Sequence, residues 1–240
     1  MRDRFDILFS LCLWGIGFSF FLASFVVIVL CLLSLTRDQT MAVMRLLFRI
    51  QVRLAGIKLR VEGRSNIQPG QTYLIMGNHQ SLFDLFVIPS AIPLTFVGIQ
   101  AARHFSYPFF GFLIKKWGNI PIQRRRLKAA KHSLAKAAAT LNSGTCLAIM
   151  PEGHRTLTGL MGPLKKGPFH LAKAANADIL PFGVHGLFDV QAKGAFHIRP
   201  GTVRVTIGRP IPKKTIDALS VEELRSQVAQ ELLVLCRQED

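Results

Sequence analysis

Two short motifs in this chain carry side chains that could do chemistry together. The first is Asn78-His79-Gln80-Ser81-Leu82-Phe83-Asp84, in which an aspartate follows a histidine after four other residues. The second is Met150-Pro151-Glu152-Gly153-His154-Arg155. A histidine that a carboxylate orients can act as a general base, and an arginine can bind an anionic group. Together the two motifs favour the transfer of an acyl group onto an anionic lipid.

The spacing of His79 and Asp84 sets a geometric condition on the first motif. Residues five apart on a regular α-helix point about 140° away from each other, so a contact requires His79 to precede the first turn and fold back. Asp84 would then accept a hydrogen bond from one imidazole nitrogen, and the other nitrogen would take a proton from an attacking hydroxyl. The nucleophile would come from the substrate, and its attack on a thioester would pass through one tetrahedral oxyanion. The alternative is a helix cap at Ser81 and Asp84, with His79 bonded to the backbone.

The second motif follows an apolar run, so its loop should leave the end of a strand, beside the first motif if the sheet is parallel. Gly153 permits a close backbone approach or a positive φ, and Arg155 can bind a phosphate through two hydrogen bonds. Glu152 is expected to hold such cations in place or to bond a substrate hydroxyl. The alternative is a surface turn with a solvated ion pair, and His154 is more typical of an exposed turn residue.

Short apolar, β-branched or aromatic runs alternate with helix-length stretches along the rest of the chain. The runs are Ile57–Val61, Thr72–Met76, Leu94–Ile99, Thr145–Met150, Ile179–Val184 and Thr202–Ile207. Helices are predicted over about Arg126–Leu141 and over Lys165–Ala175. A C-terminal helix is indicated by a capping-box signature and an apolar stripe, formed by Ser220, Glu223, Leu224, Val228, Leu232 and Leu235. This alternation predicts an α/β domain with His79 on a strand-to-helix loop.

The N-terminal part of the chain is apolar enough to enter a bilayer. From Ile7 to Leu35 there is no charged residue, and this stretch exceeds the about 20 residues that cross a hydrocarbon core. Its length and its lack of a small-residue cleavage site disfavour a secretory signal peptide. Gly15 and Gly17 allow a bend, so a re-entrant helical pair stays open beside a single span.

Cationic residues around this segment predict its orientation. Two precede it and six follow it within reach of the membrane, namely Arg2 and Arg4 against Arg37, Arg45, Arg49, Arg53, Lys58 and Arg60. The catalytic domain is therefore expected on the cytoplasmic face of the membrane, which in a bacterium is the inner membrane.

The stretch from Thr40 to Leu54 is predicted to form a basic helix that rests on the membrane. Arg45, Arg49 and Arg53 recur every four residues on one helical face among apolar residues, a pattern suited to a headgroup layer. The alternative is an ordinary amphipathic helix packed on the domain.

The length of the chain suits one catalytic domain with accessory segments. We divide the 240 residues into 1–55 for the membrane segment and basic helix, 56–215 for the catalytic domain, and 216–240 for the C-terminal amphipathic helix. Four cysteines without a Cys-x-x-Cys pair indicate neither a zinc site nor a disulfide framework.

The charge of the chain indicates a polyanionic partner. The formal net charge is +16, and no acidic residue lies between Asp84 and Glu152. A nucleic acid is disfavoured because Tyr73, Tyr107 and Trp117 form no stacking array beside the basic residues. A membrane surface or a phosphate-bearing substrate is the better match.

The two motifs resemble those of the lysophospholipid acyltransferase family, typified by 1-acyl-glycerol-3-phosphate acyltransferase. The hallmarks of that family are Asn-His-x-x-x-x-Asp and a later Phe-Pro-Glu-Gly-Thr-Arg block, and the resemblance runs from roughly Gly56 to Pro212. It implies a mostly parallel central sheet flanked by helices, with His79 as the base and Asp84 as its orienting partner. The acyl donor would be a thioester of coenzyme A or of acyl carrier protein, and neither a metal nor a resident cofactor is implied.

The resemblance also implies an acceptor site. The stretch Gly118-Asn119-Ile120-Pro121-Ile122-Gln123-Arg124 is similar to the acceptor-binding block of the family, which ends in Asp-Arg. Arg124 is thereby expected to bind phosphate and Gly118 to form its turn. The acceptor site would be completed by Glu152, Gly153 and Arg155. The chain departs from the family at Gln123 (usually Asp), Met150 (Phe), His154 (Thr) and Ala102-Arg103-His104 (often Lys-Glu-Leu).

These observations predict a membrane-bound acyltransferase that forms phosphatidic acid from 1-acyl-glycerol 3-phosphate in phospholipid biosynthesis. Glycerol 3-phosphate or another lyso-lipid, including a lyso-aminolipid, remains an alternative acceptor. Two other interpretations stay open. One is a non-catalytic lipid-binding protein, and the other is a hydrolase in which water replaces the alcohol.

Overall fold

The strands form where the sequence carries its β-branched and aromatic runs. The computed structural model describes residues 2–123 and 127–237. Its strands are β1 Ile57–Glu62, β2 Tyr73–Gly77, β3 Phe96–Ala101, β4 Ile120–Ile122, β5 Cys146–Ile149, β6 Asp178–His185 and β7 Gly201–Ile207. Six of them coincide with the predicted runs. Strand β4 was not predicted, because three residues with a proline in the middle are too short to show a period.

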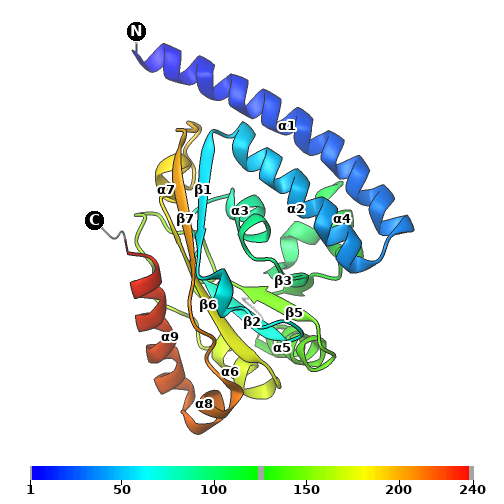
Figure 1. The fold of residues 1–240 in the computed structure, drawn as a ribbon, viewed down its shortest axis with the longest axis vertical. Coiled ribbons are helices and arrows are strands. Elements are labelled where there is room, and N and C mark those ends of the chain that lie inside the picture. The colour runs from blue at the N-terminus through cyan, green and yellow to red at the C-terminus, as the bar shows by residue number, and fades with distance from the viewer. Residues whose placement is uncertain (1, 124–126, 238–240) are drawn as a thin grey trace.

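The described strands make one seven-stranded sheet in the order β1-β7-β6-β2-β5-β3-β4 (Figure 1). Every neighbouring pair is parallel except β6 and β7, which are antiparallel, so the mostly parallel sheet is confirmed. Strands β2 and β5 are neighbours, with Leu74 opposite Leu147. Their carboxyl ends therefore lie at the same edge of the sheet, and this brings the loops of the two motifs together.

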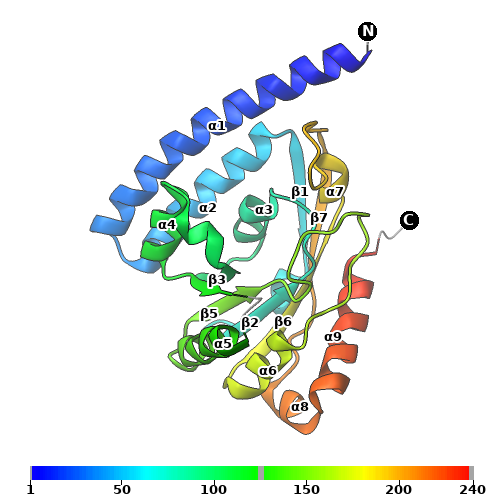
Figure 2. The ribbon, with the colours of Figure 1, turned by 180° about the vertical axis from the view of Figure 1, so that it is seen from behind.

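Helices cover both faces of the sheet. They are α3 Asp84–Ala91, α4 Phe110–Trp117, α5 Leu127–Asn142, α6 Gly167–Ala174, α7 Leu187–Val190, α8 Lys213–Ala218 and α9 Val221–Leu235, with short 3-10 turns at Arg64–Asn66 and Ala102–Ser106. Helix α9 packs on β6, and α3 lies on the other side of the sheet (Figures 1 and 2). The capping box of α9 is present, and its apolar stripe buries Leu224, Val228 and Leu232. The predicted C-terminal helix is thus confirmed.

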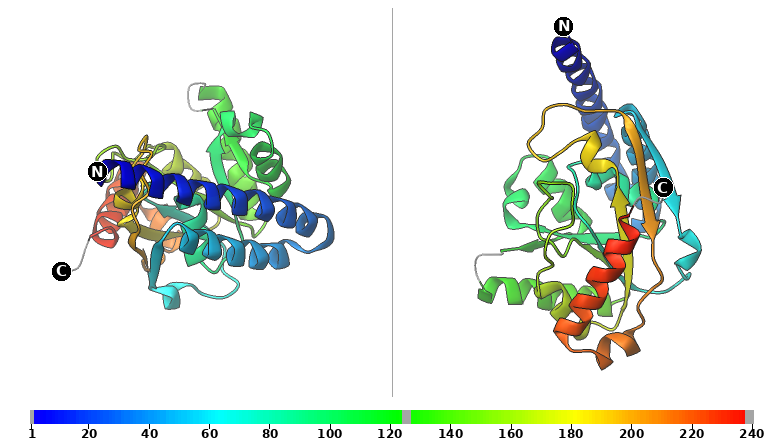
Figure 3. Two further views of the ribbon diagram at one scale, coloured as in Figure 1. Left: turned by 90° about the horizontal axis from the view of Figure 1, so that it is seen from above. Right: turned by 90° about the vertical axis from the view of Figure 1, so that its left-hand side faces the viewer.

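Two further helices, α1 Arg2–Ser34 and α2 Arg37–Leu54, form a hairpin that covers one end of the domain (Figure 3). A capping box between Thr36 and Gln39 starts α2. Helix α1 runs without interruption through Gly15 and Gly17, so the bend that these glycines allow does not occur. The chain turns only after α1 ends at Ser34, before α2 begins. Gly17 of α1 faces α2, where an added Cβ would lie 3.0 Å from Nε2 of Gln51.

Helix α1 lies along the domain, with specific contacts on its inner side. The indole Nε1 of Trp14 donates to the carbonyl oxygen of Phe196 at 2.7 Å, and the rings of Trp14 and Phe83 are 6.0 Å apart. On the outer side most large apolar side chains are exposed. Within α1 the stretch Asp6–Ser34 contains an 18-residue window with a mean hydropathy of 2.8 and is long and apolar enough to cross a membrane. It combines a docked face with an apolar outer face.

Helix α2 packs on the domain, as the alternative interpretation of its sequence required. Met41, Met44 and Phe48 are buried. Arg45 and Arg49, which were expected in a headgroup layer, donate to backbone carbonyls at the end of α3, and Arg45 also donates to the backbone carbonyl of Leu94 just before β3. The correction has a simple reason, because the helical period shows which residues share a face but not which neighbour that face meets.

Candidate active site

His79 and Asp84 meet at the carboxyl end of β2. The imidazole Nδ1 lies 2.6 Å from Oδ2 of Asp84, and the side chains are 28% and 4% exposed. His79 lies in the loop after Gly77, whereas Asp84 is the first residue of α3. The geometric condition on the motif is therefore met. Because a carboxylate only accepts hydrogen bonds, Nδ1 carries the proton, and the partly exposed Nε2 keeps a free lone pair.

The carboxylate of Asp84 also holds the loop that carries His79. Its Oδ2 accepts hydrogen bonds from the backbone N–H groups of Gln80 and Ser81, both at 2.9 Å. Its Oδ1 is buried and has no hydrogen-bond partner among the described residues. The N-cap of α3 is Phe83, which forms no side-chain cap, so the alternative of a helix cap at Ser81 does not describe this turn.

Three polar side chains inside the motif tie the loop to the neighbouring strand and helix. Asn78 exchanges two hydrogen bonds with the backbone of Val184, at 2.8 and 2.7 Å. Oε1 of Gln80 accepts from the backbone N–H groups at the start of α7, and the hydroxyl of Ser81 donates to the carbonyl oxygen of Gln191 at 2.7 Å. Sequence reasoning missed these roles. Their partners lie more than a hundred residues away, and no local pattern marks them.

Glu152 is a buried tie between the two loops. The residue is only 1% exposed. Its Oε1 accepts a hydrogen bond from the backbone N–H of His79 at 2.8 Å, and its Oε2 accepts one from the backbone N–H of Gly162 at 2.7 Å. Among the described residues it pairs with no Lys or Arg side chain, which corrects the expectation that it holds cations. Each oxygen keeps a further lone pair, but the burial of the side chain limits access by a substrate hydroxyl. The sequence suggested a ligand because a Pro-Glu-Gly turn is normally exposed.

Burial raises the pKa of Glu152 above its ordinary value of 4.5, and the hydrogen bonds from Gly162 and His79 oppose this rise. The native protein therefore holds a proton on Glu152 at a pH where the unfolded chain has lost it. As the pH rises from about 4.5 through that interval, this group makes the fold progressively less stable. Glu152→Gln removes the titration. In thermal unfolding measured at several pH values across this interval, we expect the unfolding temperature of the wild type to fall relative to that of the variant as the pH rises. A difference that stays constant with pH would contradict the raised pKa of Glu152.

The second motif lies directly beside His79. Gly153 has a φ of 76°, which is the left-handed conformation that its sequence position predicted. The backbone N–H of Thr156 donates to the carbonyl oxygen of His79 at 2.9 Å. Arg155 is partly exposed, and among the described residues its guanidinium forms no hydrogen bond or ion pair. The site thus combines a histidine paired with a carboxylate and an arginine without a partner, whereas His154 is exposed.

Gly118 is placed elsewhere. It has a φ of 95° and ends α4 as a turn residue, close to Nη2 of Arg37. It precedes β4 and so lies at the edge where the parallel strands begin, opposite the edge that carries His79. The expectation that Gly118 joins the substrate site is therefore wrong. The motif does not show in which direction the neighbouring strand runs, and that direction decides on which edge Gly118 lies. Arg124 lies outside the described residues, and its role as a phosphate ligand stays a prediction.

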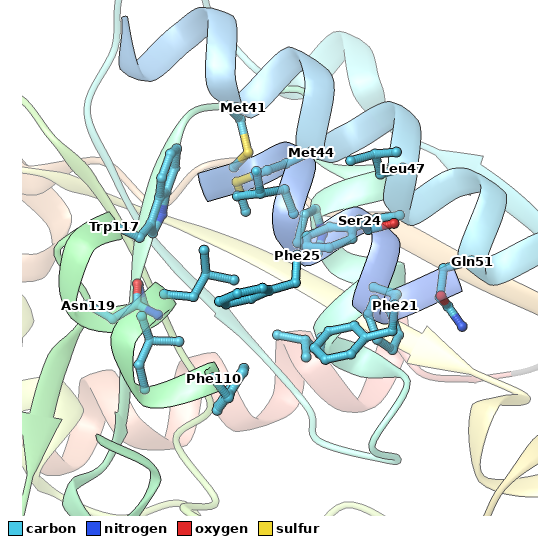
Figure 4. A pocket seen from close by; sticks show the side chains of 18 of the residues that line it. Phe21, Ser24, Phe25, Met41, Met44, Leu47, Gln51, Phe110, Trp117 and Asn119 are labelled. Atoms are coloured by element: carbon cyan, nitrogen blue, oxygen red, sulfur yellow. The ribbon is translucent and has the colours of Figure 1, made fainter. Parts of the chain in front are cut away.

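An apolar cavity of about 110 Å³ lies beneath the helical hairpin. Phe21 and Phe25 of α1 and Phe110 of α4 point into the space below Met41 and Met44 of α2 (Figure 4). The lining reaches the two residues that follow Asp84 and also includes four polar side chains, namely Ser24, Gln51, Gln100 and Asn119. No group of three His, Cys, Asp or Glu side chains that could hold a metal ion occurs in the described part of the chain.

A mostly parallel α/β sheet that presents a histidine, its carboxylate partner and an unpaired arginine at one edge is the kind of site that suits an enzyme with a general base. The Acyltransferase family model matches residues 58–185, and the chain belongs to this family of enzymes. It is 28% identical over 201 residues to the human 1-acyl-sn-glycerol-3-phosphate acyltransferase alpha, covering 83% of this chain and 71% of that protein.

Two further matches agree with this assignment. The Mus musculus 1-acyl-sn-glycerol-3-phosphate acyltransferase alpha is 29% identical over 224 residues, covering 92% of this chain and 78% of that protein. The crystal structure of the 1-acyl-sn-glycerophosphate (LPA) acyltransferase PlsC from Thermotoga maritima matches with a TM-score of 0.83 at 22% identity and covers 100% of both chains. At that identity the structural match establishes the shared fold.

Proposed function

We propose that this protein transfers a fatty acyl group from an acyl thioester to the free hydroxyl of 1-acyl-glycerol 3-phosphate at a membrane surface, forming phosphatidic acid. The observation that carries the proposal is the His79–Asp84 pair, which leaves Nε2 as a base at an exposed edge. The names of the relatives supply the acceptor. The acyl donor is a thioester of coenzyme A or of acyl carrier protein.

In the proposed reaction, Nε2 of His79 takes the proton from the acceptor hydroxyl as its oxygen attacks the thioester carbonyl carbon. A tetrahedral oxyanion forms, and its collapse breaks the carbon–sulfur bond. The proton held by His79 then passes to the departing thiolate. Asp84 stabilises the imidazolium that forms between the two transfers, because its Oδ2 is in contact with Nδ1. All atoms leave as a diacyl lipid and a free thiol.

The helical hairpin is proposed to hold this chemistry at the bilayer. Helix α1 has an apolar outer face for lipid and an inner face fixed to the domain. The cation count on either side of α1 supports a catalytic domain on the cytoplasmic face. The cavity beneath the hairpin is smaller than the about 150 Å³ that admits benzene in an engineered core, so it would take only part of an acyl chain.

The test offers detergent-solubilised protein a panel of lyso-acceptors with acyl-CoA or acyl carrier protein as donor. Mass spectrometry identifies the lipid formed, and a thiol reagent measures the carrier released. We expect phosphatidic acid from 1-acyl-glycerol 3-phosphate. Free fatty acid as the main product would indicate a hydrolase. Recovery of unchanged ligands with every donor and acceptor would indicate a lipid-binding protein and would refute the proposal.

Arg155 is expected to bind the acceptor phosphate, since its guanidinium is unpaired and its loop borders His79. Two charge-assisted hydrogen bonds of about 1.5–3 kcal/mol each make a loss of at least about tenfold in affinity the expected result of Arg155→Gln. The effect should appear in KM for the phosphate-bearing acceptor. Arg60→Gln removes an exposed charge from β1 and serves as the control. Equal KM values for the two variants would remove Arg155 from the acceptor site.

A further inference from the structure

Helix α3 connects the catalytic carboxylate to the helical hairpin. It begins at Asp84 and ends at Ala91, so its last carbonyl groups have no partner within the helix. Arginines of α2 supply partners for them. Arg45 donates from Nε to the carbonyl oxygen of Pro89 at 3.3 Å, and Arg49 donates from Nε to that of Ser90 at 3.4 Å.

Arg45 forms a second bond that extends this connection. Its Nη2 donates to the carbonyl oxygen of Leu94 at 3.3 Å, just before β3 begins. One guanidinium therefore bridges the end of α3 and the chain that leads into the sheet. The ring of Phe48, one turn along α2, packs edge-on against Phe86 of α3 at 5.4 Å. Polar and apolar contacts together fix the end of α3 against the hairpin.

The two arginines lie close together although their charges repel. Burial, followed by the neighbouring Arg49 guanidinium, lowers the pKa of Arg45, which shows that the arrangement is unfavourable for the charge. The negative end of the α3 dipole, and the carbonyl groups there that have no partner within the helix, attract the two cations and offset this cost. Arg53 continues the same row of α2 and is exposed, as Arg49 is, but within the described residues its guanidinium has no partner. Arg45 and Arg49 thus differ from Arg53 in what they contact.

We propose that Arg45 and Arg49 are positioning residues for catalysis. By fixing the C-terminal end of α3, they keep Asp84 at its N-terminal end in contact with His79. Helix α3 is only about 12 Å long and is rigid, so a tilt at one end displaces the other. This inference rests on the proposed function. According to this inference, proton transfer requires the hairpin to be attached to α3. This requirement does not depend on any contact of the arginines with lipid headgroups.

The test compares Arg45→Gln, Arg49→Gln and Arg53→Gln in full-length protein, with thiol release at saturating acceptor and binding to vesicles of phosphatidylcholine and phosphatidylglycerol. We expect kcat to fall about tenfold for the first two variants with little change in KM, because a small displacement of a catalytic group is costly. Arg53→Gln should keep the wild-type kcat. Vesicle binding should fall by the same small factor in all three, since each loses one charge.

Lysine variants supply a readout that a loss of folding would not produce. Arg49→Lys keeps a donor for its single bond and should recover most of the kcat lost in Arg49→Gln. Arg45→Lys should recover only part, because one ammonium group cannot span the two carbonyls that Arg45 reaches. Equal kcat values in all three glutamine variants, or an effect confined to vesicle binding, would overturn the proposal. A wild type without transfer activity would instead refute the proposed function.

Discussion

Replacing His79 by alanine is expected to lower the rate of acyl transfer by about 10³-fold, the middle of the range for a lost general base. Nε2 of His79 is the acceptor that the Asp84 contact leaves free, and the described residues offer no second side chain paired in this way beside it. The acceptor hydroxyl would have to lose its proton to water. Thiol release under single-turnover conditions measures the chemical step directly and keeps it separate from product release.

The control for this experiment is His132→Ala, which removes an exposed histidine of α5. It should retain wild-type turnover. Binding of the lyso-acceptor to His79→Ala should also persist, because Arg155 and the helical hairpin remain in place. An alanine variant that turns over as fast as the wild type would exclude His79 as the base, whatever the role of Asp84.

Replacing Asp84 by asparagine is expected to lower kcat by about 10² to 10⁴-fold while leaving KM nearly unchanged. A carboxylate accepts all three of the hydrogen bonds that converge on Oδ2, from His79, Gln80 and Ser81. An amide has one accepting oxygen and a donating NH₂ group. If the oxygen stays with the backbone N–H groups, the loop survives, but the imidazole loses the negative charge that stabilises its protonated form.

Asp84→Ala separates the two roles of this side chain. Alanine removes the acceptor for two backbone N–H groups as well, so the variant should unfold at a lower temperature than Asp84→Asn. The two variants should nevertheless show similar residual turnover, because both lack the charge. Full activity in Asp84→Asn would show that orientation by any acceptor is sufficient and that the charge itself contributes little.

Much of the fold was predictable because its strands are buried and continuous. The five residues of β2 are all buried, and a run of this kind is visible in the sequence without knowledge of its neighbours. The helix α5 was equally clear from its alanines and lysines. By contrast, β4 and α4 were not predicted, since both are short and their residues are selected by packing against β3 and α1.

The site was predictable only in part. The His79–Asp84 contact followed from spacing, because the two residues are close in sequence and a turn between them has few conformations. Glu152 was expected to hold cations in place or to bond a substrate hydroxyl, but among the described residues it pairs with no Lys or Arg side chain, and both its oxygens accept from backbone N–H groups. Gly118 was expected in the acceptor site, but it lies at the opposite edge of the sheet. Both errors concern partners that depend on strand order and direction.

By itself, the sequence determined the kind of chemistry available, the α/β class and the apolar N-terminal helix, because residue type and local period decide these. The tertiary structure alone decided which backbone groups the side chains of Glu152, Arg45 and Arg49 would satisfy. Such partners lie across a sheet or between packed helices. Their identity follows from the burial of every donor and acceptor in one common arrangement, and no single segment contains that information.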